Sequence, residues 1–367
     1  MPFTLPPYRH PDFSTREFTV APPARFDRAV KDGVAPGDYH ATSIFPEYFH
    51  LSSAQWVLPG ESRMDCVAVL ANDGSIEIKE FRNIRAGDEV ACGRRENGED
   101  GIFVHARAFD FMDSASEKFA FRSRITRETS FSIDYDELYD LLDYERQHGF
   151  VVWVLGPAVV FDRDARNAFA GLVGRGYVHA LLAGNALATH DVEACLFSTG
   201  LGQDIYSKRT VPLGHYHHLD AINTIRRIGS LKEAIVRGAL TNGIMKALIE
   251  KDVPFVLAGS IRDDGPLPEV TGDAYAAQDG MRALTRKATT VIAMATQLHA
   301  IATGNMAPSY HVGTDGTVRP VYFYTVDMSE FAVNKLANRG SLTARSILTN
   351  VQDFVVTVER GLRLRAG

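Results

Sequence analysis

The sequence VPFVLAGSIRDDGP, from Val253 to Pro266, indicates the fold more clearly than any other part of the chain. A continuous apolar run that ends at glycine predicts a strand buried on both faces, as in a parallel sheet. Open parallel sheets bind their ligands just beyond the carboxyl ends of such strands. Arg262, Asp263 and Asp264 follow this strand directly, so we expect them at a functional site.

Apolar runs alternate with helical patterns from about residue 126 to the end of the chain. This alternation predicts an α/β, Rossmann-like domain with a doubly wound parallel sheet and crossover helices. The expected strands are Phe150–Leu155, Val178–Leu182, Val253–Leu257, Thr290–Ala295 and Val321–Val326. The expected helices are Tyr135–His148, Arg163–Arg175, Leu219–Ile228, Leu231–Ile249, Asp273–Lys287 and Phe331–Ala337.

The chain before about residue 125 has a different pattern, which predicts a β-rich N-terminal domain. Short β-rich runs such as Cys66–Leu70 and Ser75–Phe81 are separated by turn residues. Asp73-Gly74, between these two runs, indicates a hairpin. A length of 367 residues agrees with two domains, which we expect at residues 1–125 and 126–367.

Composition and charge narrow the class of partner. The chain has 45% hydrophobic residues, 23% charged residues and a net charge of −6, as in a globular protein without the clustered cations that nucleic-acid binding needs. No apolar stretch approaches the ~20 residues of a membrane span, and the N-terminus lacks a signal-peptide pattern. The cysteines and histidines show no zinc-site spacing. We expect a cytoplasmic protein, a homo-oligomer by its size, with no metal and no nucleic-acid or membrane partner.

Several strand ends in the α/β part close with glycine and small polar residues, which predicts a nucleotide-binding rim. Glycine lets a backbone approach a ligand closely, and the helix that follows offers free N–H groups to a phosphate. Each turn alone is more often an ordinary β–α connection, but the four together favour a ligand. The first turn lacks the GxGxxG fingerprint. The residues at these ends are Gly156, Pro157, Asn185, Ala186, Gly259, Ser260, Thr296 and Gln297.

Arg262, Asp263 and Asp264 form the sharpest local signal for chemistry. Adjacent carboxylates repel each other, which can raise the pKa of one of them, and a guanidinium can bind a substrate carboxylate. The three residues can thus supply a base and a cation. The alternative is an Asx turn in which Arg262 forms a structural ion pair.

Other polar residues at strand ends are also candidates. Asp327 can accept hydrogen bonds from ribose hydroxyls, or it can cap the next helix. His299 comes just after a strand end and is expected to contact a cofactor or a substrate. His215, His217 and His218 precede a helix and are compatible with metal binding, with anion binding or with a capping role, but their spacing matches no common zinc site.

Several long strings in the chain resemble the archaeal-type ornithine cyclodeaminases. That family carries the label "LOR/SDH bifunctional enzyme conserved region" and also forms the C-terminal part of cyanobacterial arginine dihydrolase/ornithine cyclodeaminase proteins. The strings are ESRMDCVAVL (61–70), GPAVV (156–160), LLAGNALATHD (181–191), HYHHLDAIN (215–223), VPFVLAGSIRDDGPLPEV (253–270), LHAIATGNM (298–306) and NKLANRGS (334–341).

The resemblance implies an NAD-dependent conversion of L-ornithine, or of a related diamino acid, to L-proline or a cyclic imino acid with release of ammonia. Hydride would pass to NAD⁺ and return to a cyclic imine, so the cofactor would be recycled. Asp264 or Asp263 would accept a proton, and Arg262 or Arg63 would bind the α-carboxylate. Arg63 and Asp65 would close the substrate side.

By position in the matching strings, the resemblance also implies a set of cofactor or active-site contacts. This chain departs from the family pattern at Asn338 and Asn350, where the family usually has acidic residues. These departures favour one alternative hypothesis, a non-catalytic NAD or amino-acid binder. A second alternative is an opine or saccharopine-type dehydrogenase. The implied contacts are Gly156, Pro157, Asn185, Ala186, Asp264, Thr296, Gln297, His299, Asp327 and Asn350.

Overall fold

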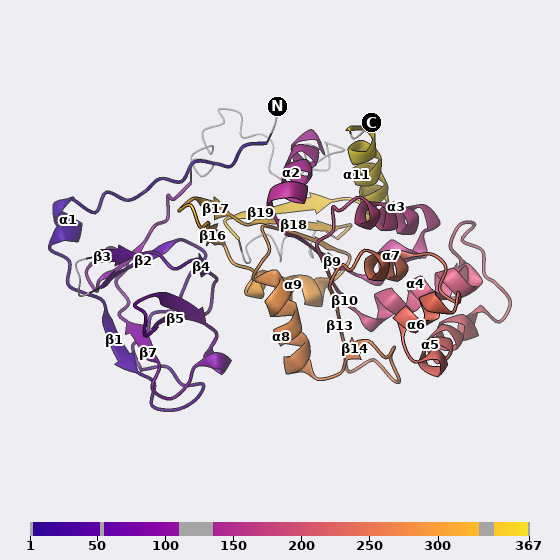
Figure 1. Ribbon diagram of the computed structural model, residues 1–367, viewed down its shortest axis with the longest axis horizontal. Coiled ribbons are helices and arrows are strands. Elements are labelled where there is room, and N and C mark those ends of the chain that lie inside the picture. The colour runs from indigo at the N-terminus through magenta and orange to yellow at the C-terminus, as the bar shows by residue number, and fades with distance from the viewer. Residues whose placement is uncertain (1–2, 52–54, 110–134, 330–340, 366–367) are drawn as a thin grey trace.

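The computed structural model describes residues 3–51, 55–109, 135–329 and 341–365, and its α/β part is built on one large sheet (Figure 1). The strands of this sheet are β9 (Val151–Leu155), β10 (Ala180–Gly184), β13 (Phe255–Ala258), β14 (Val270–Thr271), β15 (Thr290–Met294), β18 (Tyr322–Asp327) and β19 (Thr343–Leu348). They pair in parallel in the order β14-β13-β10-β9-β15-β18-β19. Apart from β14, this is the strand order of a Rossmann fold. The predicted fold class is confirmed.

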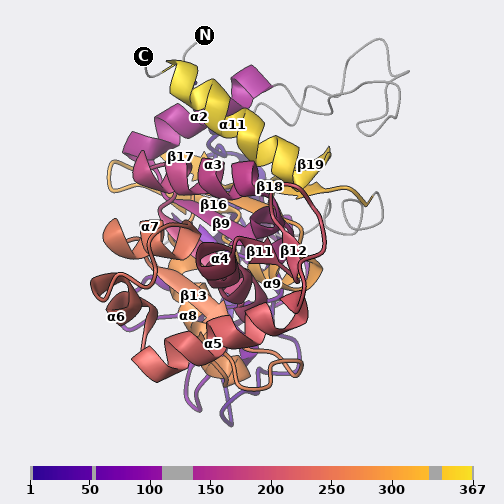
Figure 2. The ribbon, with the colours of Figure 1, turned by 90° about the vertical axis from the view of Figure 1, so that its right-hand side faces the viewer.

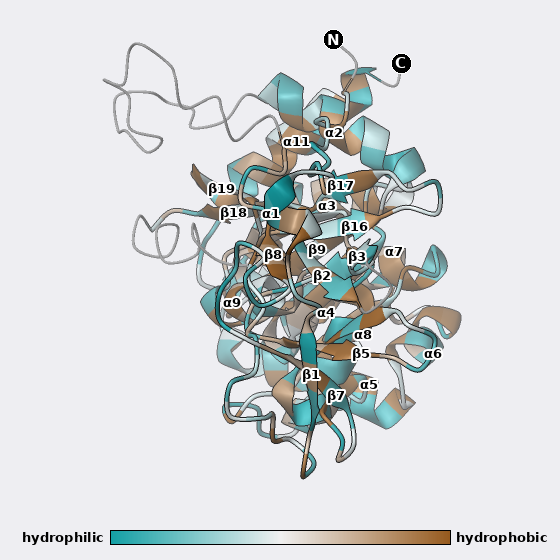
Figure 3. Cartoon of the chain, turned by 90° about the vertical axis from the view of Figure 1, so that its left-hand side faces the viewer, coloured by the Kyte–Doolittle hydropathy of each residue, from teal (hydrophilic) through white to brown (hydrophobic). Residues whose placement is uncertain are grey.

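Two layers of helices cover the sheet, because the side chains of each buried strand alternate between two apolar cores. Trp153 of β9 faces one core, whereas Val152 and Val154 face the other. The larger core is covered by α2 (Tyr135–His148), α3 (Arg163–Gly174), α4 (Asn185–Phe197), α5 (His217–Ile228), α6 (Leu231–Val236), α7 (Ile244–Glu250) and α11 (Val351–Arg365). The smaller core is covered by α8 (Ala274–Thr285) and α9 (Gln297–Met306). In Figure 3 the helices carry brown bands beside teal ones, as helices with one buried face should.

The N-terminal part contains two small antiparallel sheets, in agreement with its β-rich pattern. Its elements are α1 (Arg16–Thr19), β1 (Arg25–Arg28), β2 (Glu47–Leu51), β3 (Gln55–Val57), β5 (Val67–Leu70), β6 (Ile76–Lys79), the 3₁₀ turn η1 (Phe81–Asn83), β7 (Glu89–Cys92) and β8 (Ile102–Val104). The strand orders are β1-β7-β5-β6 and β3-β2-β8. The β5–β6 hairpin turns at Asp73-Gly74, as predicted, and pairs Leu70 with Ile76.

A third small sheet joins the two parts of the chain. In it, β4 (Glu61–Ser62) pairs with β16 (Tyr310–Val312), which in turn pairs with β17 (Val318–Pro320). Because β17 leads directly into β18, this sheet lies at the amino edge of the large sheet. Figure 1 agrees, since the arrows of β18 and β19 point away from the N-terminal sheets. The predicted domain boundary at residues 125 and 126 falls outside the described residues.

Some elements differ from those expected. The single helix predicted over Leu231–Ile249 is wrong, because α6 ends at Val236 and α7 begins only at Ile244. Gly243, just before α7, has a φ of +113°, a conformation that interrupts a helix. The helices α4, α9 and α11 and the strand β19 were not predicted, and Phe331–Ala337 lies outside the described residues. Within the described residues, no helix is both long and apolar enough to span a bilayer.

Just past the carboxyl ends of the central strands β9 and β15, Gly156 packs against Ala295. The Gly156 N–H donates to the Met294 carbonyl oxygen at 2.8 Å. Ala295 has a φ of +52°, which is unusual for a residue with a side chain. A Cβ on Gly156 would lie 1.9 Å from the Ala295 carbonyl oxygen. Only glycine fits at this point of the sheet.

We expect Gly156→Ala to lower the free energy of unfolding by about 3 kcal/mol, the upper part of the usual range for adding a methyl group to a packed site. Urea denaturation monitored by circular dichroism measures the change. The control is Gly174→Ala in α3, where no atom lies within 4 Å of the added Cβ, so its stability should stay the same or rise. Equal stabilities of the two variants would contradict this account of Gly156.

Candidate functional site

Most of the predicted site residues lie along the carboxyl edge of the large sheet, toward which Figure 2 looks. In a Rossmann fold the ligand binds at this edge, where the strand order reverses, here between β9 and β15. The residues brought there are Gly156 and Pro157 after β9, Asn185 and Ala186 at the start of α4, Arg262, Asp263 and Asp264 between β13 and β14, Thr296, Gln297 and His299 at the start of α9, Asp327 at the end of β18, and Asn350 before α11.

The loop after β13 is fixed by the side chains of Asp263 and Asn185. The Asp263 carboxylate accepts a hydrogen bond from the Ser260 N–H at 2.8 Å and one from the Asn185 amide at 3.5 Å. The amide oxygen of Asn185 accepts from the Leu267 N–H at 3.2 Å and from the Thr189 hydroxyl at 3.1 Å. In place of the Asx turn that the sequence allowed, the Asp263 side chain reaches back three residues to Ser260, whose carbonyl oxygen accepts from the Asp263 N–H at 3.0 Å. Asn185 ties this loop to α4.

His299 lies against the same loop. A Cβ on Gly184 would be 3.0 Å from Cε1 of His299, so the imidazole packs on the backbone at the end of β10. Burial lowers the pKa of His299, and the negative charge of Asp263 opposes that effect only in part. At neutral pH the ring is therefore neutral, and it can accept a proton.

Arg262 and Asp264 point outward from this loop. Both residues are exposed, and their side chains make no hydrogen bond or ion pair with the described part of the chain. The backbone N–H of Arg262 is held by the Ser260 hydroxyl at 3.2 Å. The loop thus offers one cation and one carboxylate that are not already paired, and it uses Asp263 to hold its own shape.

Asp327 and Asn350 lie side by side at the ends of β18 and β19. The Asp327 carboxylate accepts from the Ser329 N–H at 2.8 Å, and its carbonyl oxygen accepts from the Thr349 N–H at 3.1 Å. The Asn350 side chain accepts from the Gln352 N–H at 2.8 Å, as a helix cap for α11 does. Both side chains therefore have a local structural role, and each keeps a second oxygen or an amide for a ligand.

The carboxyl edge also presents helix starts without side-chain caps. Gly184, before α4, and Thr296, before α9, make no side-chain capping bond, so the first N–H groups of both helices are open to an anion. The 3₁₀ turn η3 (Pro157–Phe161) follows Gly156, and α3 begins only after it, capped by Asp162. This extra turn explains why no GxGxxG motif is present at the first strand.

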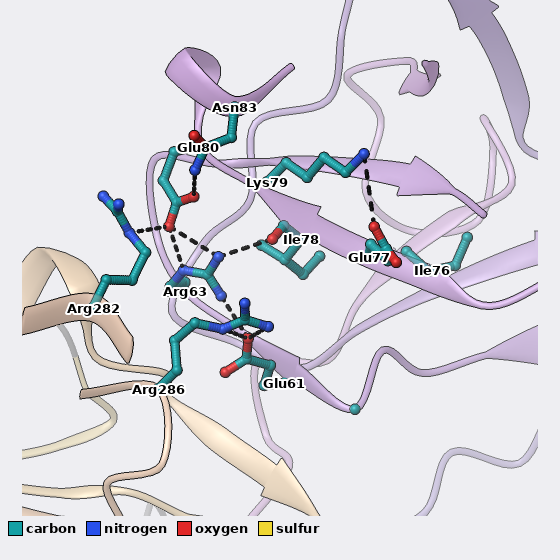
Figure 4. A pocket seen from close by; sticks show the side chains of 11 residues that line it. Glu61, Arg63, Ile76, Glu77, Ile78, Lys79, Glu80, Asn83, Arg282 and Arg286 are labelled. Atoms are coloured by element: carbon teal, nitrogen blue, oxygen red, sulfur yellow. Dashed lines mark hydrogen bonds and ion pairs between the residues drawn. The ribbon is translucent and has the colours of Figure 1, made fainter. Parts of the chain in front are cut away.

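Arg63 and Asp65 are not brought to this edge. Arg63 is 1% exposed and lies at the amino edge of the large sheet. The length of β15, at about 3.3 Å per residue, separates this edge from the carboxyl ends of the strands by roughly 15 Å or more. Its guanidinium donates to Glu80 at 3.0 Å, to Glu61 at 2.7 Å and to the Ile78 carbonyl oxygen at 2.8 Å (Figure 4). Asp65 is exposed nearby, with its N–H bonded to the Thr42 carbonyl oxygen.

The helix α4 carries buried polar side chains that the sequence analysis did not single out. The Asp191 carboxylate is fully buried and accepts from Nε of Arg166 at 2.6 Å. It also accepts the N–H groups of Ile244 at 3.0 Å and Met245 at 2.8 Å, at the start of α7. The available signal was the group of polar residues His190, Asp191 and Glu193 within the otherwise apolar sequence LATHDVEACL. If this segment is a buried helix, each of these side chains requires a hydrogen-bond or ionic partner.

Glu193 organises the histidines of this region. It accepts from Nδ1 of His190 at 2.6 Å and from the Thr199 hydroxyl at 2.9 Å, and the Thr199 hydroxyl lies 2.8 Å from Nδ1 of His217. Burial acts to raise the pKa of Glu193, but these hydrogen bonds outweigh burial and lower it. His217 therefore has a structural partner, and neither it nor any neighbour caps α5.

One group of three possible metal ligands lies close together within the described residues, and it is far from the carboxyl edge in the N-terminal part. Asp27, Asp38 and Cys92 offer ligand atoms within 4.8 Å of one another. Arg25 forms ion pairs with both carboxylates, so the cluster has a cation already.

We expect Asp263→Asn to lower the pKa of His299 further, because the carboxylate charge that favours the protonated ring is lost. Asn keeps the oxygen that accepts from the Ser260 N–H. NMR titration of the His299 ring measures the effect, and Asp264→Asn serves as the control, with an unchanged titration. A pKa of His299 that rises in Asp263→Asn would contradict the electrostatic role of Asp263.

We expect Arg63→Met to lower the free energy of unfolding by about 3 kcal/mol, the lower end for a broken buried ion pair, because Glu61 and Glu80 keep other arginine partners. Chemical denaturation measures this value. The matched control, Arg82→Met, removes a more exposed pair with Asp279 and should cost less than about 1 kcal/mol. Unchanged stability of Arg63→Met, with weaker substrate binding, would instead favour Arg63 as the substrate anchor.

The fold and these residues are shared with known proteins. The family described as "Arginine dihydrolase ArgZ-like, C-terminal, Rossmann fold" matches residues 138–358. An ornithine cyclodeaminase of Methanopyrus kandleri is 38% identical over 349 residues, which cover 92% of this chain and 78% of that protein. The crystal structure of a LOR/SDH protein from Methanococcus maripaludis S2 superposes with a TM-score of 0.85 at 33% identity, over 94% of this chain and all of that one.

A further structure carries ligands. AgrE is a bifunctional arginine dihydrolase/ornithine cyclodeaminase from a Nostoc species, and its complex with ornithine and NAD⁺ matches with a TM-score of 0.58 at 30% identity. The match covers 94% of this chain and 46% of AgrE, so this chain spans about half the length of that bifunctional protein. By its sequence and its fold, the chain belongs to the ornithine cyclodeaminase family of enzymes, which shares its Rossmann-fold part with the C-terminal half of ArgZ and AgrE.

Proposed function

We propose that the chain is an NAD-dependent cyclodeaminase that converts L-ornithine, or a closely related diamino acid, to L-proline or the corresponding cyclic imino acid, with release of ammonia. The observation that carries the proposal is the 38% identity to an ornithine cyclodeaminase over 92% of this chain. The resemblance to AgrE, which has been crystallised with ornithine and NAD⁺, supports both the substrate and the cofactor.

The carboxyl edge has the groups that a dinucleotide needs. We infer that the open helix starts at Asn185-Ala186 and at Thr296-Gln297 bind the pyrophosphate of NAD, as helix N-termini do in other Rossmann folds. Asp327 offers a carboxylate to ribose hydroxyls, and Gly156 leaves space for close approach. NAD bound at this edge supplies the chemistry of taking a hydride from the substrate and returning it.

The loop after β13 has the charges that ornithine needs. Ornithine carries one carboxylate and two ammonium groups, and the unpaired Arg262 and Asp264 side chains complement the carboxylate and one ammonium group. Deprotonation of the α-ammonium group must precede loss of hydride from the α-carbon. Asp264 and the neutral His299 ring are the available proton acceptors, since Asp263 is occupied by its own loop.

Incubation of the purified protein with L-ornithine and a sub-stoichiometric amount of NAD⁺ tests the reaction. We expect equal amounts of proline and ammonia and no net accumulation of NADH, because the hydride returns to the product. Proline is measured by chromatography, ammonia by a coupled assay and NADH by its absorbance. Steady NADH formation would favour an opine or saccharopine-type dehydrogenase, and NAD binding without turnover would favour a non-catalytic binder.

We expect Asp264→Asn to lower kcat by about 100-fold or more, as loss of a general base does. Asp252→Asn is the matched control, because Asp252 lies at the amino end of the same strand and its φ of +53° is one that Asn adopts readily. Its kcat should equal that of the wild type. Full activity of Asp264→Asn, together with loss of activity in His299→Asn, would assign the proton transfer to His299 instead.

A further inference from the structure

Several large apolar side chains are exposed around the start of α5, beside α4. They come from the end of α4, from the hairpin of β11 (Thr199–Gly200) and β12 (Gln203–Asp204), and from the 3₁₀ turn η4 (Gly214–Tyr216) that leads into α5. Figure 1 places α5 at the opposite end of the molecule from the N-terminal sheets, and Figure 2 shows β11, β12 and α5 beside α4. The five residues, which we call the apolar patch, are Phe197, Leu201, Leu213, Tyr216 and Leu219.

The members of the apolar patch are exposed to an unusual degree for their type. Leu201, Leu213, Tyr216 and Leu219 are each between 51% and 68% exposed, and Phe197 is 37% exposed. Single apolar residues on a surface are common, but a group of them at one place marks a contact site more often than not.

Backbone contacts bring the two leucines of the loops together. Gly202 and Gly214 pack so closely that a Cβ on Gly214 would lie 2.4 Å from the Gly202 carbonyl oxygen. Leu201 and Leu213 directly precede these two glycines. The Tyr216 N–H donates to the Leu213 carbonyl oxygen at 3.0 Å, so the tyrosine follows at once.

The remaining members adjoin these three residues. Tyr216 and Leu219 are three positions apart where η4 passes into α5, a spacing that places them on one helical face. The ring of Phe197 stacks on the ring of His217, between those two residues in the chain, with 4.6 Å between the ring centroids. The apolar patch is therefore continuous from the end of α4 to the start of α5.

The hairpin that carries Leu201 is fixed from beneath. The buried Glu193 carboxylate accepts from the Leu201 N–H at 3.2 Å, from the Gly202 N–H at 3.1 Å and from the Thr199 hydroxyl at 2.9 Å. A surface that is already ordered loses little conformational entropy when a partner binds to it.

The backbone at Leu201 and Leu213 is also unusual. Their φ angles are +53° and +56°, in the left-handed region that asparagine and glycine adopt more readily than leucine does. Both side chains are mostly in solvent. The single chain thus holds two leucines in an unfavourable conformation without burying them, which a partner surface would explain.

The size and charge of the apolar patch indicate which partner fits. From Val211 to Leu219 the sequence has no acidic residue, lysine or arginine, as in the centre of a protein interface. The five side chains together expose on the order of 500 Å², which is at the upper end for a monomer. Two such surfaces facing each other bury about 1,000 Å² from these side chains alone, the size at which specific interfaces begin.

We propose that the apolar patch is the contact surface of a two-fold symmetric dimer, in which the partner is a second copy of this chain. The apolar patch of one copy packs on the apolar patch of the other, and because its side chains are uncharged, no like charges meet. A nucleic acid or an acidic peptide would find no counter-charge in it. Neither NAD nor ornithine is needed for this contact.

Sedimentation equilibrium of the full chain, without NAD or ornithine, tests the assembly. We expect the mass of two chains at micromolar concentrations and dissociation on dilution. A wild-type chain that stays a monomer at these concentrations would overturn the proposal. If that monomer then floats with neutral phosphatidylcholine vesicles, the apolar patch belongs to a lipid surface instead.

Substitutions by asparagine locate the contact without straining the chain. Leu213→Asn removes an apolar side chain, while asparagine suits the φ of +56° better than leucine does. We expect it to raise the Kd of the dimer by about tenfold or more, as loss of a central interface residue does, and we expect the same of Leu201→Asn. The matched control is Val30→Asn, at an apolar residue of the N-terminal part that is 87% exposed, and it should leave the Kd unchanged.

Thermal midpoints at a concentration where the wild type is monomeric check that each variant is folded. They should stay the same or rise in Leu201→Asn and Leu213→Asn, because asparagine relieves the backbone. An unchanged Kd in both variants would overturn the proposal, since another face would then form the dimer. Equal weakening in Val30→Asn would overturn it as well. None of these measurements involves proline or ammonia, so their outcome is separate from that of the proposed reaction.

Discussion

The buried carboxylate of Asp191 holds together the three helices on which the carboxyl edge rests. It balances the charge of Arg166 in α3 and satisfies two N–H groups at the start of α7, while its own helix, α4, begins at the site. Gly243 makes this arrangement possible, because a Cβ there would collide with Arg166 and Asp191. A buried charge without such partners is very costly, so these elements can form only together.

The sequence was sufficient for the parts of the fold that depend on local patterns. Buried parallel strands are short apolar runs, so β9, β10, β13, β15 and β18 were found within a few residues. The positions of the polar residues after these strands could then be predicted as well, because the carboxyl ends of parallel strands lie at one edge of the sheet. Pattern failed for α4 because nearly all of it is buried, which removes the polar face by which a helix is recognised. It failed for α9 because apolar residues lie outside its buried face as well, including Leu298, which is exposed. It failed for β19 because exposed and buried residues are mixed along it.

The roles of individual side chains could not be read from local sequence. Asp263 and Asp264 are neighbours of the same type, yet one is bonded within its loop and the other is unpaired. Arg63 seemed suited to bind a carboxylate, and in the folded chain it does, but its carboxylates are those of Glu61 and Glu80. The same cluster includes Arg282, which pairs with Glu80, and Arg286, which pairs with Glu61. These partners lie more than a hundred positions apart in the chain, so local sequence could not reveal the role of Arg63.

The pairing of β4 with β16 has a consequence for the synthesis of the protein. The hydroxyl of Ser309 donates to the carbonyl oxygen of Ser62, a contact across 247 positions of the chain. On the ribosome, β4 emerges long before the β16–β17 hairpin with which it pairs. The edge of β4 therefore stays open until most of the Rossmann-fold part has been translated. Such long-range closure slows folding and leaves the short strand β4 without its partner until β16 is made.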